Sequence, residues 1–168
     1  DGVHAAVEAG AAVLVGGVLV AGRPVGQYLL VVLVGLPVAV VVRTVAELGC
    51  AGLDPSVVVR IAEPDDIPLI LDFIRQLADH VNQSEAVVAD EDQLRKTLFG
   101  PRQVAEVVIA SFDDEPAGFA LFVHNYSTFL GQPGVYVEDL YVLPARRGRG
   151  IGRALLSFLA RLAVERGC

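Results

Sequence analysis

From residue 57 onward the sequence predicts a mixed α/β fold, in which strands and helices pack around one sheet. Three observations predict this class. Residues 57–62 form a β-branched run that is followed by apolar residues at helical spacings of three and four. Three further strand-like runs lie in the middle of the chain, and an amphipathic helical pattern follows them. The length, 168 residues in all, allows one domain with its own core.

The first predicted strand, 57–62, ends at Glu63-Pro64. Asp65 and Asp66 follow at the position where the positive end of a helix favours acids. The helix that we predict from there places its apolar side chains on one face: Ile67, Ile70, Leu71, Ile74 and Leu77. A second short helix fits residues 90–99, because Gly100-Pro101 ends it.

The next two predicted strands, 104–112 and 117–124, are joined by an acidic turn over 113–116. After the loop 125–134, residues 135–143 (VYVEDLYVL) predict another strand. Residues 151–166 then carry apolar side chains on one helical face. The predicted order is strand, helix, helix, three strands and a helix.

Residues 1–56 form an apolar extension that holds only six charged side chains and fifteen valines. Residues 24–42 are 19 uncharged residues between Arg23 and Arg43, the lower length limit for a membrane span. Glycine and proline residues in the same region suit short strands and turns equally well. Three interpretations stay open: a membrane-associated segment over 24–42, an apolar extension that associates with other surfaces, or a region unrelated to the domain at 57–168. A cleaved signal peptide is not expected, because no basic segment precedes the apolar stretch.

The net charge of −7 argues against a protein that coats nucleic acid, because that binding neutralises phosphates with Lys and Arg. Between Glu63 and Asp92 there are nine acids and one base. This acidic segment indicates either a preference for cationic substrates or helix faces that are simply exposed to solvent. The two cysteines, Cys50 and Cys168, lack metal-ligand or disulfide spacing, so no metal is expected and a reducing, cytoplasmic location is the default.

The stretch 144–156 (PARRGRGIGRALL) places arginines and glycines between a predicted strand and a predicted helix. Backbone N–H groups at such a junction point outward at the positive end of the helix dipole and bind phosphate oxygens. A Walker loop would need Gly-Lys-Ser/Thr, and a dinucleotide fingerprint would need glycine where Arg153 stands. The pattern that fits is R-x-x-G-x-G over 147–152.

This loop resembles the pyrophosphate-binding loop of the GNAT superfamily of acetyl-CoA-dependent N-acetyltransferases. The stretches DIPLILDFIRQLA, GFALFVHNYSTFLG and YVEDLYVLPARRGRGIGRALL are similar to its diamine (spermidine/spermine) acetyltransferase branch. The resemblance covers about residues 57–168. It implies a mostly antiparallel sheet flanked by helices, acetyl-CoA as co-substrate and a small amine substrate.

The resemblance also implies roles for individual residues. The backbone of Leu140, Tyr141 and Val142 would contact the pantetheine arm and the acetyl carbonyl. The residues that would hold the pyrophosphate are Arg147, Gly148, Arg149, Gly150, Ile151, Gly152 and Arg153.

Glu138 lies where diamine acetyltransferases carry a glutamate near the acceptor amine. A carboxylate there would remove a proton from the ammonium, whose pKa is about 10.4, or would bind the cation. Asp139 would point to the other face of a regular strand and be structural. His80 is a candidate substrate-binding residue. Val81 stands where relatives carry a carboxylate, which Asp79 or Glu85 could replace.

The chain stops at Cys168, before the strand and the tyrosine general acid that the family carries. We therefore expect a C-terminally truncated sheet, an acceptor site that is incomplete and a core that is open on one side. Three alternatives stay open: a protein or peptide N-acetyltransferase, a noncatalytic acetyl-CoA-binding module and a membrane-tethered interaction protein. The resemblance also implies a homodimer.

Overall fold

One seven-stranded sheet forms the centre of the protein in the computed structural model, with the strand order β3-β2-β1-β7-β6-β5-β4. The structure describes residues 13–22, 28–33, 39–42, 54–128 and 131–168. The strands are β1 (Val13–Gly22), β2 (Tyr28–Leu33), β3 (Ala39–Val42), β4 (Val57–Ile61), β5 (Glu106–Phe112), β6 (Glu115–Ser127) and β7 (Gln132–Val142). The α-helices are α2 (Ile67–His80), α3 (Glu91–Leu98) and α4 (Ile151–Glu165).

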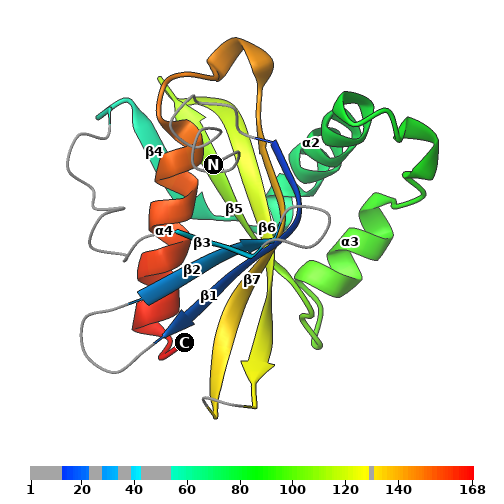
Figure 1. Ribbon diagram of the computed structural model, residues 1–168. Coiled ribbons are helices and arrows are strands. Elements are labelled where there is room, and N and C mark those ends of the chain that lie inside the picture. Colours follow the sequence, from blue (N-terminus) through cyan, green and yellow to red (C-terminus); the bar gives the residue numbers. More distant parts are fainter. Residues whose placement is uncertain (1–12, 23–27, 34–38, 43–53, 129–130) are drawn as a thin grey trace.

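From β4 to β7, each strand pairs antiparallel with the next strand in the sequence. The helices cover the two faces of this sheet (Figure 1). Helix α4 packs on one face, and α2 and α3 pack on the other. Two separate apolar clusters result, one on each face. The mixed, mostly antiparallel fold class predicted from the sequence is confirmed.

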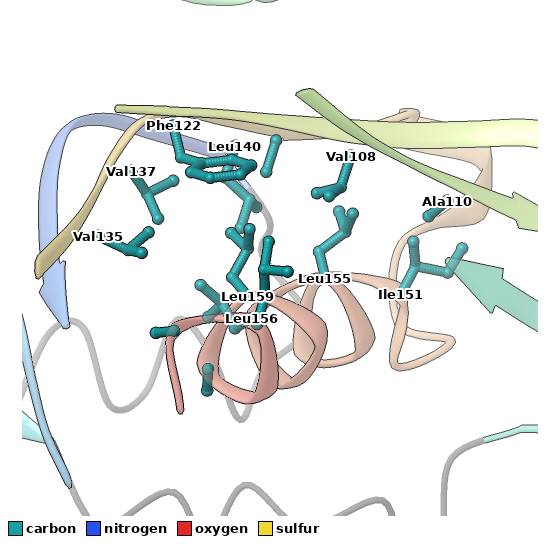
Figure 2. Packing of buried hydrophobic residues seen from close by; sticks show 14 of the residues in the cluster. Val108, Ala110, Phe122, Val135, Val137, Leu140, Ile151, Leu155, Leu156 and Leu159 are labelled. Carbon is teal, nitrogen blue, oxygen red and sulfur yellow. The ribbon is translucent and has the colours of Figure 1, made fainter. Parts of the chain in front are cut away.

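The cluster on the α4 face joins the helix to the inward residues of β5, β6 and β7 (Figure 2). Leu155 and Leu159 of α4 are 0% and 1% exposed, and they face Phe122 and Val137, which are both fully buried. Since fully burying one such side chain contributes about 1.5–3 kcal/mol, this cluster fixes α4, and the loop before it, on the sheet.

The cluster on the α2 face is built around aromatic rings. Phe73 of α2 stacks on Phe119 of β6, with ring centroids 5.4 Å apart and an interplanar angle of 2°. Tyr141 of β7 lies beside Phe73 at 6.4 Å and is 2% exposed. These contacts place the middle of α2 against β6 and β7.

The helices begin where the sequence predicts them. At α3, the Asp90 side chain accepts a hydrogen bond from the Gln93 backbone N–H at 2.8 Å, and the Gln93 side chain accepts one from the Asp90 N–H at 3.1 Å. This capping box satisfies two donors that the helix geometry leaves open. The observed bounds of the α-helices and of β4 to β7 agree with the predicted ranges to within a few residues at each end.

The N-terminal strands correct one expectation. The side of the sheet beyond β7 was expected to be open, but β1 pairs antiparallel with β7 there, and β2 and β3 follow. Residues 24–42 include β2 and β3, and within the described residues no helix is long and apolar enough to cross a membrane. Membrane association through 24–42 and the domain boundary at 56 stay predictions.

Candidate active site

Strand β7 is interrupted at Glu138, the candidate catalytic residue. On the β6 side, Leu121 is opposite Asp139 and Phe122 is opposite Val137, so that no residue of β6 is opposite Glu138. On the β1 side, Val15 is opposite Asp139 and Val18 is opposite Val137, so that Gly16 and Gly17 face this one residue. A bulge of this kind bends the strand and redirects a side chain.

The bulge also changes the face on which Asp139 lies. Val137 and Leu140 both belong to the cluster on the α4 face, although they are three residues apart. Asp139 is opposite Leu121, which packs on the α2 face, and residues opposite each other in a ladder share a face. The expectation for Asp139 assumed a regular strand. Regular alternation from Val137 would place Asp139 on the α4 face, whereas the bulge places it on the α2 face, because one extra residue shifts the alternation.

Asp139 is half-buried, and its electrostatic environment disfavours its charge. Burial, and then the neighbouring charge of Glu138, raises the pKa of the Asp139 carboxyl to about 6. Glu138 is exposed, and in the part of the chain that the structure describes its carboxylate makes no hydrogen bond or ion pair. Two adjacent acids with different environments therefore lie at the bulge.

The three residues that were expected to offer their backbone to the cofactor point alternately to the two edges of β7. The Tyr141 carbonyl faces β6, because a Cβ built on Gly118 would lie 2.5 Å from its oxygen. The Leu143 N–H also faces β6 and donates to the Ala117 carbonyl at 2.9 Å. Strand alternation then directs the backbone groups of Leu140 and Val142 to the edge of β7 that faces away from β6. We call this edge the outer edge of β7.

Arg147 connects this outer edge to the glycine loop. Its Nε donates a hydrogen bond to the Val142 carbonyl oxygen at 3.0 Å, and its guanidinium lies 5.8 Å from the centre of the Tyr141 ring. One terminal nitrogen of the guanidinium is buried and has no hydrogen-bond partner in the described structure. A buried donor without a partner costs about 1–3 kcal/mol, so an acceptor from water or from a bound ligand at this nitrogen would stabilise the arrangement.

The glycine loop leads into α4 with two residues in the left-handed region. Gly148 and Gly150 have φ values of +77° and +76°, which glycine adopts without strain, and both are exposed. The first bond of α4 runs from the Ala154 N–H to the Gly150 carbonyl at 2.9 Å, so the amides of the first turn point out of the helix end. Ile151 is 1% exposed and fixes this end on the core, whereas Gly152 and Arg153 are half-buried.

Two further arginines pack on one aromatic ring beside the loop. The guanidinium groups of Arg146 and Arg149 lie 5.4 and 4.8 Å from the centre of the Phe112 ring. Such contacts hold a cation at a defined place for about 0.5–1 kcal/mol. The structure thus gathers the predicted residues from Leu140 to Arg153 at one end of the sheet, around the start of α4.

The candidate acceptor side lies at the C-terminal end of α2. His80 is exposed, and its ring lies 6.5 Å from that of Tyr141. The Tyr141 hydroxyl lies 3.5 Å from the Gln76 side-chain oxygen. Burial raises the pKa of Tyr141, Arg147 opposes this shift, and Asp72 and Asp79 add to it. His80 is therefore near β7, but no contact in the described residues joins it to Glu138.

Both residues proposed to replace the carboxylate missing at position 81 lie at or just after the C-terminal end of α2. Asp79 accepts a hydrogen bond from the Ser84 hydroxyl, and Glu85 lies exposed in the short 3-10 turn after α2. Among the residues that the structure describes, no group of three or more His, Cys, Asp or Glu side chains is arranged to hold a metal ion.

Gln76 and Phe112 were not predicted from the sequence as residues of this site. Gln76 precedes His80 by four residues, so helical spacing places both on the face of α2 that meets Tyr141. Phe112 carried no such signal, because its contact with Arg146 and Arg149 depends on how the end of β5 meets the loop.

The protein thus combines an antiparallel sheet, a bulge on its central strand, and a glycine loop that leads into a helix N-terminus, where backbone amides can bind an anion. The sequence profile of the acetyltransferase (GNAT) family matches residues 71–168. The chain belongs to this family and is an N-acetyltransferase by that membership.

Several characterised acetyltransferases are similar to this chain. Thialysine N-epsilon-acetyltransferase of Sus scrofa is 36% identical over 121 residues, which are 67% of this chain and 71% of that protein. L-ornithine N5-acetyltransferase of Arabidopsis thaliana is 27% identical over 154 residues, with 65% and 68% of the two chains covered. The human spermidine/spermine N(1)-acetyltransferase-like protein 1 is 32% identical over 117 residues, which are 66% of this chain and 17% of that protein.

Solved structures agree on the fold. An aminoglycoside acetyltransferase from an uncultured soil metagenomic sample, in complex with sisomicin, superimposes with a TM-score of 0.58 at 20% identity, covering 67% of this chain and 72% of that one. An integron cassette protein from the mobile metagenome of V. cholerae gives 0.56 at 24% identity, covering 68% and 72%. The resemblance that the sequence predicted is confirmed.

Proposed function

We propose that this chain transfers the acetyl group of acetyl-CoA to a primary amine of a small polyamine-like or amino-acid-like acceptor, by direct attack of the amine on the thioester. The observation that carries the proposal is Arg147, which joins the glycine loop to the outer edge of β7 and keeps one buried donor unpaired. A co-substrate with phosphates at one end and an amide-containing arm at the other fits this arrangement.

The co-substrate would lie along two neighbouring features. The diphosphate would accept hydrogen bonds from the amides at the start of α4, where Gly148 and Gly150 leave open space beside the backbone. The pantetheine arm would run along the outer edge of β7, toward the bulge. Val142 and Glu138 are four residues apart, so the edge between loop and bulge is about 13 Å long at roughly 3.3 Å per residue.

The acceptor must lose a proton before it attacks, because an alkylammonium has a reference pKa of about 10.4. Glu138 is exposed at the bulge and is free to take this proton, directly or through one water molecule. The amine nitrogen then forms a bond to the acetyl carbon, the carbon–sulfur bond breaks, and the departing CoA thiolate takes up the proton that the attacking nitrogen loses. Backbone N–H groups at the interrupted part of β7 would stabilise the oxyanion of the tetrahedral intermediate.

The acceptor class is supported by the relatives and by charge. The related enzymes are named for thialysine, L-ornithine and spermidine/spermine, each of which is a small molecule with an amine on an aliphatic chain. Between Glu63 and Asp92 the chain carries nine acids and one base, and this segment includes α2. An acidic surface near the site attracts a cationic acceptor and would repel an anionic one.

The test is a thiol-release assay with acetyl-CoA and a panel of diamines, thialysine, ornithine and basic peptides. We expect release with the small amines, and we expect Glu138→Gln to lower kcat by a factor of about 10²–10⁴. Glu115→Gln, at the exposed first residue of β6, is the matched control and should leave kcat unchanged. Release with peptides alone would overturn the small-acceptor proposal, and release with no amine would overturn the catalytic one.

A further inference from the structure

We propose that β1 is a built-in competitor of acetyl-CoA, because it occupies the outer edge of β7 that the co-substrate arm needs. The proposal rests on the function proposed above. Strand β1 is in register with β7 from Val13 opposite Tyr141 to Val20 opposite Val135. The paired part of β7 includes Leu140 and both sides of the bulge at Glu138.

The competition arises at Leu140. Its backbone N–H and C=O face the outer edge, and Leu14 of β1 lies opposite it. A backbone N–H or C=O that is paired in a ladder is not available to the amides of a pantetheine arm. Strand β1 and the arm would therefore exclude each other at this residue.

Arg147 limits how far β1 reaches toward the loop. The Val142 carbonyl, which also faces the outer edge, accepts the hydrogen bond from Arg147, and the register of β1 ends at Tyr141. The diphosphate-binding loop at Gly148 and Gly150 thus remains exposed while β1 is in place. Acetyl-CoA can bind first through its diphosphate, and its arm then displaces β1 from Leu140.

The first residues of β1 are held more weakly than the rest. Within the described residues, β2 pairs with β1 over Val18–Gly22, so that residues 13–15 have β7 as their one described neighbour in the sheet. The glycine pair Gly16-Gly17 at the bulge separates them from the three-strand part, and glycine weakens a strand interior. Residues 13–15 can therefore leave the outer edge of β7 while β1 stays attached to β2.

The first experiment weakens this contact in the full chain. Leu14→Pro removes the N–H that faces the Leu140 carbonyl, whereas Val13→Pro, at the first residue of the strand, removes an N–H that faces away from β7. We expect Leu14→Pro to bind acetyl-CoA roughly 2- to 12-fold more tightly than the parent, the equivalent of one backbone hydrogen bond of about 0.5–1.5 kcal/mol. Val13→Pro should bind with the affinity of the parent.

The second experiment uses the parent protein, so it does not depend on how a proline variant folds. Acetyl-CoA should increase hydrogen–deuterium exchange in peptides that contain residues 13–15 and decrease it in the glycine loop. If acetyl-CoA protects both segments, or if Leu14→Pro binds it no better than Val13→Pro, the competition is excluded while the proposed function stands. If neither the parent nor Leu14→Pro binds acetyl-CoA, the proposed function itself fails.

Discussion

Asp139 is a residue whose charge opposes folding at neutral pH. The pKa of its carboxyl is about 6 in the folded protein and near 3.9 in an unfolded chain. At pH values between these two, the carboxyl is therefore protonated in the folded state and ionised in the unfolded state. The free energy of unfolding therefore falls as the pH rises from about 4 to about 6, by at most about 3 kcal/mol. Asp139→Asn should raise the free energy of unfolding at about pH 7.5 by up to this amount and have little effect at about pH 4.

Urea unfolding at the two pH values measures this difference. Asp114→Asn is the control, because Asp114 lies exposed in the turn before β6 and asparagine also tolerates its positive φ of 64°. Equal effects of the two substitutions at both pH values would contradict the assignment of the shift to Asp139.

Substitutions at Gly150 and Gly167 distinguish the expected role of the glycine loop in binding acetyl-CoA from the effect of backbone strain. Their φ values are +76° and +71°, and a Cβ at either position would meet no atom within 4 Å. Gly150→Glu and Gly167→Glu should therefore each lower the free energy of unfolding by a similar amount, about 1–2 kcal/mol. Only Gly150→Glu should weaken acetyl-CoA binding, by at least about tenfold, because it places a negative charge at the expected diphosphate site.

Calorimetric titration of both variants with acetyl-CoA checks this expectation. Equal affinities would remove the loop from the binding site.

At the residue scale the sequence predicted the position of this loop between a strand and a helix, since the spacing of Arg147, Gly148, Gly150 and Gly152 is a local property. It could not predict the bond from Arg147 to Val142, because that bond depends on how the loop folds back over β7.

Helix α4 is the element that holds the loop on the sheet, and Leu155 is its fully buried contact. Leu155→Ala should lower the free energy of unfolding by about 2–5 kcal/mol, because it removes buried methyl groups and leaves a cavity. Val164→Ala in the same helix, where the side chain is 37% exposed, should change it by no more than about 0.5 kcal/mol. Thermal unfolding of the two variants measures the difference, and similar losses would contradict the packing of α4.

At the element scale, periodicity was sufficient to predict α2, α3, α4 and the strands from β4 to β7. The stretch VYVEDLYVL also predicted the strand that became β7, but not its bulge. Whether a residue is opposite another one in a ladder depends on two strands, and the sequence of one strand does not contain this information. This is why the sequence alone did not indicate the face on which Asp139 lies.

The whole molecule carries a net charge of −7, which would attract the cationic acceptor that we propose. A diamine with two positive charges is attracted over a distance that falls from about 30 Å in 0.01 M salt to about 10 Å in 0.1 M salt. We expect kcat/KM for such a diamine to fall by a factor of roughly 3 to 10 over this range. Initial-rate kinetics with a monoamine as the control should show a smaller decrease, and equal decreases would argue against charge attraction.

The arrangement of the complete sheet was the part that the sequence predicted least. Residues 1–56 differ in composition from the rest, and this difference suggested an unrelated or membrane-associated region. In the structure β1, β2 and β3 extend the same sheet beyond β7. Valine-rich segments bounded by glycine and proline are compatible with a strand or with a membrane span, and only their neighbours in space distinguish the two.

The interruption of β7 at Glu138 has a consequence for how such an enzyme gains or loses its activity over time. Loss of the single codon for this residue would leave Val137 and Asp139 opposite Phe122 and Leu121, the partners that they already have. The ladder to β6 would become continuous, and the buried side chains on both faces would keep their places. If Glu138 removes the acceptor proton as proposed, descendants of this chain lose or regain their activity through one in-frame deletion or insertion that the fold tolerates.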